Sequence, residues 1–390
     1  MAEAGALGQI ARAGKWFAIV GAMALSACQV VPKGPPRPTG PVAPPTRPET
    51  GTLPTDTQRN RVALLVPMSG PNAGVGESIA NAANMAVLDT GGKTIRVTMY
   101  DTAGGAAAAA QKAIAEGNRL ILGPLLADDV RAVAPVARSA RIPVVSFSND
   151  ASVAGNGVYV MGFAPAQSID RVVQFARSKG VTKFAGLIPS GLYGQRASTA
   201  FLRSVESAGG QVVSLQTFDR NAGSMSAAVT RLSASSAYEA VLVADSARAA
   251  VQFAPMVRAK GGAAARMLGT ELWNAEGALG ANPALRGAWF ASVSDGVYNQ
   301  LATKYRTRFG KGAYRLASLG YDSVLLVTRI GSDWAFGAPF PVARLADAGG
   351  FTGIDGAFRF GRDGVAERAL EVQQAGPGGF TVVDAAPRGF

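Results

Sequence analysis

From residue 61 onward the chain alternates short apolar runs with longer amphipathic, alanine-rich stretches. The short runs are rich in Val, Ile and Leu, as buried strands are, whereas the longer stretches repeat their apolar residues with helical spacing. The first series has expected strands at 61–68, 95–101, 119–125 and 143–149, and expected helices at 77–89, 105–117 and 128–140. Alternation at this spacing predicts βαβ units, in which helices cover both faces of a parallel sheet.

A second series of the same kind follows the strand-like segment 157–163. Its expected strands are at 183–189, 211–218, 238–245 and 266–272, and its expected helices at 166–180, 194–210, 225–234 and 247–262. Two successive series predict two similar lobes, since a chain of 390 residues exceeds the size at which one hydrophobic core stops growing.

The remaining segments predict further passages of the chain between the lobes. Helical segments at 298–309 and 318–330 follow the strand-like 287–293, so we expect the chain to cross back to the first lobe. Residues 358–372 resemble a hairpin with Gly361 and Gly364 at its turn, and we expect this hairpin to return to the second lobe.

The N-terminal residues follow a different pattern. An apolar run at 16–25, preceded by Arg12 and Lys15, has the layout of a secretory signal and is shorter than the ~20 residues that a membrane-spanning helix needs. It ends in Leu-Ser-Ala-Cys at 25–28, which resembles the bacterial lipobox, in which the cysteine receives diacylglycerol. We therefore expect a signal peptide over 1–27 and lipidation of Cys28; the alternative is an ordinary signal peptide with a chance cysteine.

Residues 28–60 are dominated by proline and show no apolar periodicity. Such a segment is expected to form an extended tether of ~3.1 Å per residue, reaching on the order of 80 Å. This composition fits two alternatives: a passive linker, or a spacer that lets the folded part reach a distant partner. In the Gram-negative pattern, Gln29 after the cysteine implies an outer-membrane lipoprotein that faces the periplasm.

Composition excludes several kinds of chemistry. The chain has no histidine and a single cysteine, which excludes His-dependent triads, Cys or His metal clusters and an intramolecular disulfide. The loop 69–76 is neither a dinucleotide fingerprint nor a P-loop, and no hydrolase serine motif occurs. The net charge of +12 favours acidic partners, but without a run of basic residues interleaved with aromatics we expect no nucleic acid. We expect no catalytic residues, cofactor or metal.

Several short motifs, in their order and spacing, resemble the type I periplasmic binding proteins of the leucine/isoleucine/valine-binding group. They lie at 62–76, 121–124, 142–146, 192–194, 320–322 and 353–360. The resemblance covers nearly all of 61–390 and implies an α/β fold of two Rossmann-like lobes, with parallel sheets flanked by helices, joined by crossing hinge segments. The expected lobes are 61–163 plus 294–335 and 164–293 plus 336–390, with hinges near 163–167, 291–296 and 331–352.

Within that superfamily, segments 123–126, 193–196 and 319–322 look most like the binding-protein-like domain of the lipoprotein activators of penicillin-binding proteins. This resemblance implies a non-enzymatic outer-membrane lipoprotein that activates or scaffolds a peptidoglycan synthase. The alternative is the substrate-binding lipoprotein of an ABC transporter for branched-chain or related amino acids. A sensor domain is a remoter reading.

Ligands of open α/β sheets collect at the carboxyl ends of the strands, so a cleft between the lobes is the expected site. Its expected residues are Ser69, Leu126, Ser148, Asn149, Tyr193, Asp245 and Glu271. By the resemblance, Tyr193 and Glu271 match the family's aromatic and acidic positions, while Ala127 and Asp150 replace a serine and a threonine that bind the ligand's carboxylate. The replacements disfavour capture of ordinary amino acids. An amino-acid-like ligand, or residues that merely close the lobes, are the remaining readings.

Overall fold

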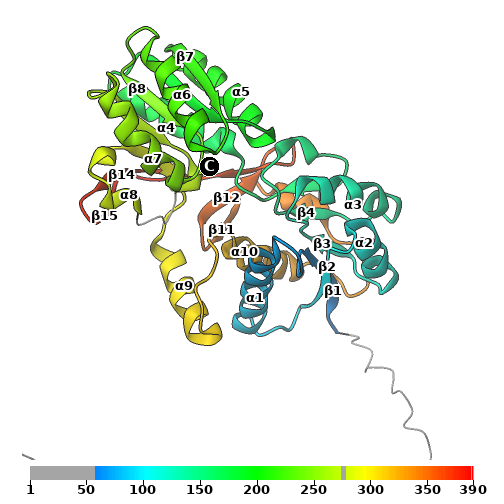
Figure 1. Cartoon of the computed structure of the whole chain (residues 1–390). Helices are drawn as coiled ribbons and strands as arrows, with labels where there is room; N and C mark the ends of the chain where they lie inside the picture. The colour runs from blue at the N-terminus through cyan, green and yellow to red at the C-terminus, as the bar shows by residue number, and fades with distance from the viewer. Residues whose placement is uncertain (1–57, 274–277, 388, 390) are drawn as a thin grey trace, which may run out of the picture. The chain divides into compact units, whose positions relative to one another are not determined.

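The computed structural model of the chain describes residues 58–273, 278–387 and 389. These residues form two lobes, each with its own sheet between layers of helices (Figure 1). The predicted signal peptide, the predicted lipidation site Cys28 and most of the predicted tether lie outside the described residues. Along the described chain, no helix is both long enough and apolar enough to cross a membrane.

The first lobe is built on a parallel sheet with strand order β2-β1-β3-β4-β5. In this lobe the strands and helices alternate as β1 Asn60–Val66, α1 Ala73–Asp89, β2 Ile95–Asp101, α2 Ala106–Ala115, β3 Leu120–Leu122, α3 Ala127–Ser139, β4 Val144–Ser146 and β5 Val158–Val160, with a short 3₁₀ turn at Ala151–Val153 before β5. Successive side chains of a strand point to opposite faces. Accordingly Val62 and Leu64 pack with α1, whereas Ala63 and Leu65 pack with α2 and α3.

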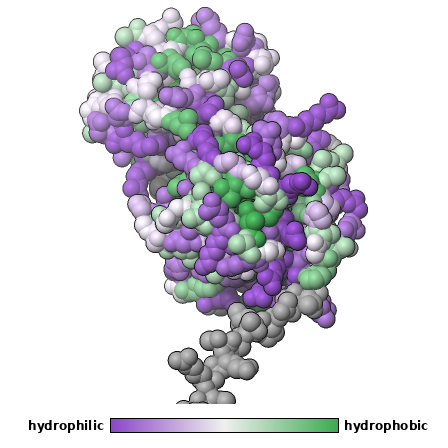
Figure 2. Space-filling view, turned by 90° about the vertical axis from the view of Figure 1, so that its right-hand side faces the viewer, coloured by the Kyte–Doolittle hydropathy of each residue, from purple (hydrophilic) through white to green (hydrophobic). Residues whose placement is uncertain are grey.

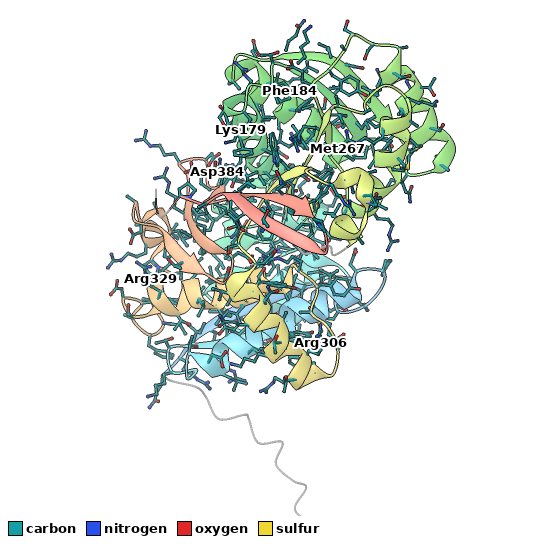
Figure 3. All side chains as sticks on the ribbon, turned by 90° about the vertical axis from the view of Figure 1, so that its left-hand side faces the viewer. Lys179, Phe184, Met267, Arg306, Arg329 and Asp384 are labelled. Atoms are coloured by element: carbon teal, nitrogen blue, oxygen red, sulfur yellow. The ribbon has the colours of Figure 1, made fainter. Side chains whose placement is uncertain are left out.

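The second lobe holds a seven-stranded sheet of order β15-β14-β10-β9-β8-β6-β7. Its elements are α4 Pro165–Ser178, β6 Lys183–Pro189, α5 Leu192–Ser207, β7 Gln211–Phe218, α6 Ala222–Ser233, β8 Ala240–Val243, α7 Ala247–Ala259, β9 Arg266–Gly269, α8 Ala278–Ala281 and β10 Trp289–Ser292, with 3₁₀ turns at Glu271–Trp273 and Pro283–Leu285. Phe184 and Met267, both labelled in Figure 3, belong to the core layers on opposite faces of this sheet. The predicted α/β class with helix-flanked parallel sheets is confirmed.

The chain then returns to the first lobe through α9 Gly296–Phe309 and α10 Ala317–Gly331. Helix α10 packs along α1, and its residues Leu319, Val324 and Val327 join the core of the first lobe. A 3₁₀ turn at Val342–Ala346 and a small antiparallel sheet follow, formed by β11 Phe351–Gly353, β12 Gly356–Phe360 and β13 Ala366–Arg368. The hairpin expected around Gly361 and Gly364 is the β12–β13 pair.

The expected place of residues 336–390 in the second lobe is wrong for the first part of that segment. Phe340, Leu345, Phe351, Phe358 and Phe360 are buried in the core of the first lobe. Only the antiparallel pair β14 Glu371–Gly376 and β15 Gly379–Asp384 joins the second lobe, where β14 lies beside β10. The chain therefore makes its third crossing between β13 and β14 and not within 331–352. Aromatic burial decides this, because a β-hairpin packs where a core receives its apolar side chains.

All core clusters of the described chain lie between residues 60 and 384. A fragment that begins at residue 58 therefore keeps every buried contact that the structure describes.

Candidate functional site

The cleft between the lobes contains a cavity of about 410 Å³. It lies where the carboxyl ends of the strands of both lobes face each other, and it is also lined by crossing segments. Eight apolar and four polar residues line it: Asn72, Val75, Leu125, Leu126, Phe147, Asn149, Phe163, Glu271, Leu272, Val293, Arg315 and Leu316. Figure 2 shows the narrow waist between the two lobes, with apolar surface beside it.

The loop after β3 forms the apolar wall of the first lobe. Leu125 and Leu126 line the cavity from this loop, and Leu126 is 40% exposed although it is apolar. Gly123 brings the loop close to β1, because a Cβ at this residue would lie 2.1 Å from the carbonyl oxygen of Leu65. Its φ of +86° is also one that residues with a side chain rarely adopt. The glycine thus fixes the position of both leucines.

Glu271 forms the acidic wall of the second lobe, just after β9. Its carboxylate accepts a hydrogen bond from the Tyr193 hydroxyl at 3.1 Å and another from the Ser168 hydroxyl. Burial raises the pKa of Glu271, although these hydrogen bonds oppose the shift. The pKa of the Tyr193 hydroxyl is raised well above its usual value by burial and by the charge of Glu271, so Tyr193 stays a donor. This cluster offers the cavity an acidic group held in a fixed orientation.

Arg315, in the loop before α10, provides the basic group of the cavity. Its Nη1 lies 2.6 Å from Oδ1 of Asp355, which has no exposed surface, and its guanidinium lies over the Tyr298 ring at 3.9 Å from the centroid. Asp322 and Arg368 extend this buried charged cluster behind the cavity wall. Burial and the charge of Asp355 raise the pKa of Asp322 to about 7.

Asp150 lies near the cavity, in the loop after β4. Its carboxylate is buried, and its two oxygens lie 2.7 Å from Arg131 Nη2 and 3.4 Å from Arg196 Nη2. Arg131 comes from α3 of the same lobe and Arg196 from α5 of the second lobe. Burial acts to raise the pKa of Asp150, but the hydrogen bonds from Ser152 and the charges of Arg196 and Arg131 outweigh it and lower that pKa.

The structure brings only part of the predicted site together. Leu126, Asn149 and Glu271 line the cavity, and Tyr193 supports Glu271 from behind. Ser148 is buried, and its hydroxyl accepts from the backbone of Asp150. Neither Ser69, which donates to Asp101, nor Asp245, which pairs with Arg220 at 2.8 Å, is among the residues that line it.

No sequence pattern marks the basic group or several of the apolar residues that line the cavity. Arg315 and Leu316 fall between two helices, with no strand end to mark them, and Asn72 and Val75 lie at the start of α1. Phe163 and Val293 lie at the crossings that the sequence predicts as hinges. That position is the sequence feature that could have placed them in the cleft. The site is therefore an apolar cavity with one acidic and one basic group, suited to binding an amphipathic molecule. Among the described residues, no group of His, Cys, Asp or Glu has the arrangement of a metal site.

Comparison with known proteins gives a family match over most of the chain. Residues 60–379 match the family model described as periplasmic binding protein. An uncharacterized protein of Rickettsia prowazekii (strain Madrid E) is 30% identical over 139 residues, which is 35% of this chain. That match spans only 37% of the relative's own length.

Solved structures of the same fold cover nearly all of the described chain. A branched-chain amino acid ABC transporter periplasmic ligand-binding protein from Burkholderia xenovorans LB400 superposes with a TM-score of 0.71 at 16% identity, covering 84% of this chain and 96% of that one. A putative branched-chain amino acid ABC transporter from Rhodospirillum rubrum gives a TM-score of 0.72 at 19% identity, with 83% and 100% coverage. A solute binding protein from R. palustris in complex with benzoate gives 0.64 at 20% identity, with 85% and 97% coverage. At these identities the similarity shows the fold.

Proposed function

The chain belongs to the periplasmic binding protein family, and from this membership we propose that it is an outer-membrane lipoprotein that activates or scaffolds a peptidoglycan synthase. The family is a substrate-binding, non-catalytic class of envelope-facing proteins. Our proposal assigns the two-lobed body the role of holding a partner protein, with Cys28 as its lipid anchor.

The ion pairs of Asp150 carry this proposal. The resemblance puts Asp150 where amino-acid binders of this family have a threonine, and Ala127 where they have a serine. In the cleft, the Asp150 carboxylate is held by Arg131 and Arg196 at 2.7 and 3.4 Å. The α-carboxylate of an amino acid would lack both hydroxyl donors here, and it would have to compete with the Asp150 carboxylate for Arg131 and Arg196, which costs affinity. Without amino-acid capture, the surface of the two lobes would remain available for a protein partner.

The test is direct binding between purified proteins. The fragment 58–390 is immobilised and exposed to bifunctional peptidoglycan synthases purified from the same organism, and the polymerisation and crosslinking rates of each synthase are measured with and without the fragment. We expect saturable capture of one synthase and an increase in one of its two rates. If no synthase is captured even under chemical crosslinking, and no rate changes, the proposal fails.

A second candidate, a solute receptor for an ABC importer, is favoured by the cavity itself. Its walls are mostly apolar, and Glu271 and Arg315 supply the opposite charges that an amphipathic solute would need. The charge of Arg315 is partly neutralised by Asp355, so a carboxylate would have to compete with an existing ion pair. This candidate predicts a ligand with an apolar body in place of a small amino acid.

A thermal-shift screen of amino acids and of aliphatic and aromatic carboxylates separates the two candidates. A true ligand at about a hundredfold its dissociation constant stabilises the fold by ~2.7 kcal/mol. Leu126→Trp, which fills the cavity, should abolish that stabilisation, whereas Leu192→Trp should preserve it, since Leu192 is 46% exposed and does not line the cavity. A screen in which no compound raises the melting temperature excludes the solutes tested as ligands. If the Leu126→Trp variant still captures a synthase, partner binding does not require the open cavity.

A further inference from the structure

The end of the first lobe opposite the cavity concentrates positive charge. All strands of its parallel sheet start at this end, and the segments that lead into β1, β2, β3 and β4 are 58–61, 90–96, 111–119 and 138–143. These segments hold eight Lys and Arg residues against one carboxylate, that of Glu116. We define the strand-start face as the six basic residues Arg61, Lys93, Lys112, Arg119, Arg138 and Arg141.

The charges of this face are not neutralised within the fold. Lys93, Lys112, Arg119, Arg138 and Arg141 are exposed, and inside the described part of the chain none of the five has an ion pair or a side-chain hydrogen bond. Arg61 donates at 2.6 Å to the backbone carbonyl of Glu116, whose carboxylate accepts a hydrogen bond from the Tyr100 hydroxyl. The face therefore keeps a strong positive potential.

The corresponding end of the second lobe uses its basic residues differently. Arg177 donates to the Ala208 carbonyl at 2.9 Å, Arg258 to the Ala265 carbonyl at 2.7 Å, and Arg266 packs over the Trp289 ring at 4.3 Å from its centroid. These three guanidinium groups tie loops and strands together. Basic composition alone therefore does not make a binding face. The strand-start face differs because five of its six basic side chains are exposed and have no internal partner among the described residues.

Stabilisation of helix ends accounts for only part of the positive charge on the strand-start face. Lys112 and Arg138 lie in the last turns of α2 and α3, where a positive charge favours the helix dipole. Arg141 follows the end of α3 with a φ of +56°, a left-handed conformation that costs energy in a residue with a side chain. At the corresponding place after α2 the chain has Gly117, with a φ of +84°. Arg141 therefore lowers the stability of the fold relative to a glycine at the same position, and it adds a positive charge to the strand-start face.

The described chain starts at this same end. Gln58 precedes β1, whose start lies at the end of the lower lobe remote from the upper lobe in Figure 1. The thirty residues from Cys28 to Thr57 stand between it and the expected lipid. A tether of this length keeps a weakly attracted face at high effective concentration near the membrane. Each basic residue close to an anionic bilayer contributes roughly fivefold in affinity at low salt.

We propose that the strand-start face docks on the anionic phospholipid headgroups of the membrane that carries the lipid anchor, so that the cleft between the lobes points away from that membrane. This inference rests on the lipid anchoring in the proposed function. It does not depend on which partner occupies the cleft.

The test is sedimentation of the fragment 58–390 with phosphatidylethanolamine vesicles, prepared with and without phosphatidylglycerol. We expect binding only to the anionic vesicles, with affinity that falls as salt rises. The variant Arg119→Glu/Arg138→Glu/Arg141→Glu should lose at least about tenfold in affinity. The matched control Arg203→Glu/Arg248→Glu/Arg286→Glu makes the same charge change at exposed residues of the second lobe and should bind as the unmodified fragment does.

A second variant excludes misfolding as the cause. Arg141→Gly relieves the left-handed strain and removes one charge, so it should raise the melting temperature while weakening vesicle binding. Equal binding to neutral and anionic vesicles, equal loss in the control, or sedimentation with purified cell-wall sacculi but not with vesicles would overturn the proposal. The triple variant should still capture the synthase, so a failure of membrane docking and a failure of the proposed function give different results.

Discussion

Arg196 of the second lobe reaches Asp150 of the first lobe, with its Nη2 3.4 Å from Oδ1 of Asp150 and a hydrogen bond of 2.9 Å to the Ser152 hydroxyl. The pair links helix α5 to the loop after β4 and so connects the lobes by a contact outside the covalent chain. Because Asp150 is buried while Arg196 is about half exposed, the carboxylate is the member that cannot return to water without structural change.

Asp150→Asn should destabilise the fold and loosen the contact between the lobes. Loss of two charge-assisted contacts at a buried position is expected to cost about 1–3 kcal/mol in the free energy of unfolding. Urea unfolding measures the cost, and small-angle X-ray scattering measures the expected increase in radius of gyration. The control is Asp128→Asn, since Asp128 also pairs with Arg131 but its side chain is 96% exposed. An equal effect of the two substitutions would show that burial of Asp150 is irrelevant.

Arg315→Met should be among the more damaging single substitutions near the cavity. It leaves the fully buried Asp355 without its partner at 2.6 Å, which is expected to cost about 3–5 kcal/mol. The double substitution Arg315→Met/Asp355→Asn should recover part of the loss, because the uncompensated charge is gone. Arg344→Met breaks the exposed pair with Asp333 and should change the unfolding free energy by no more than about 1 kcal/mol. No recovery in the double variant would refute the electrostatic explanation.

Asp322 should make stability fall as the pH rises from about 4 to 7. The unfolded chain ionises Asp322 near its ordinary pKa of 3.8, whereas the folded chain keeps the proton up to a pKa of about 7. Between these values the folded state binds more protons, so its extra stability is complete below the lower pKa and is lost as the pH rises through the higher one. Asp322→Asn should reduce the slope of unfolding free energy against pH by up to about 1.4 kcal/mol per unit. An unchanged slope would show that Asp322 ionises normally.

Gly123→Ala should disrupt the wall of the cavity. The added methyl would lie 2.1 Å from the Leu65 carbonyl oxygen at a φ of +86°, so both contact and conformation oppose it. We expect a loss of more than about 3 kcal/mol or failure to fold. Gly155→Ala is the matched control, since its φ of +99° is strained but its Cβ would meet nothing within 4 Å. That substitution should cost about 1–2 kcal/mol. Similar losses in the two variants would assign the whole effect to backbone strain.

The sequence by itself determined that the chain has two lobes and the order of the strands and helices in each. In β1 the alternating contacts of Val62 and Ala63 with opposite helix layers follow from the period of a strand, and the helical spacing that predicted 318–330 appears in α10 at Ala317–Gly331. These features depend on local geometry, which a pattern of apolar residues encodes directly. The strand ends likewise located Leu126, Asn149 and Glu271 at the cavity.

Only the tertiary structure decided where the segments that lack a regular spacing of apolar residues would pack. Arg315 reaches the cavity because α10 packs along α1, and the aromatic hairpin β12–β13 joined the first lobe although its pattern fits either lobe. The partner of a buried charge, such as Asp355 for Arg315, lies forty residues away along the chain. Such pairings depend on which apolar surfaces pack together and on the need to compensate each buried charge. Neither condition can be recognised from the residues that neighbour the pair in the sequence.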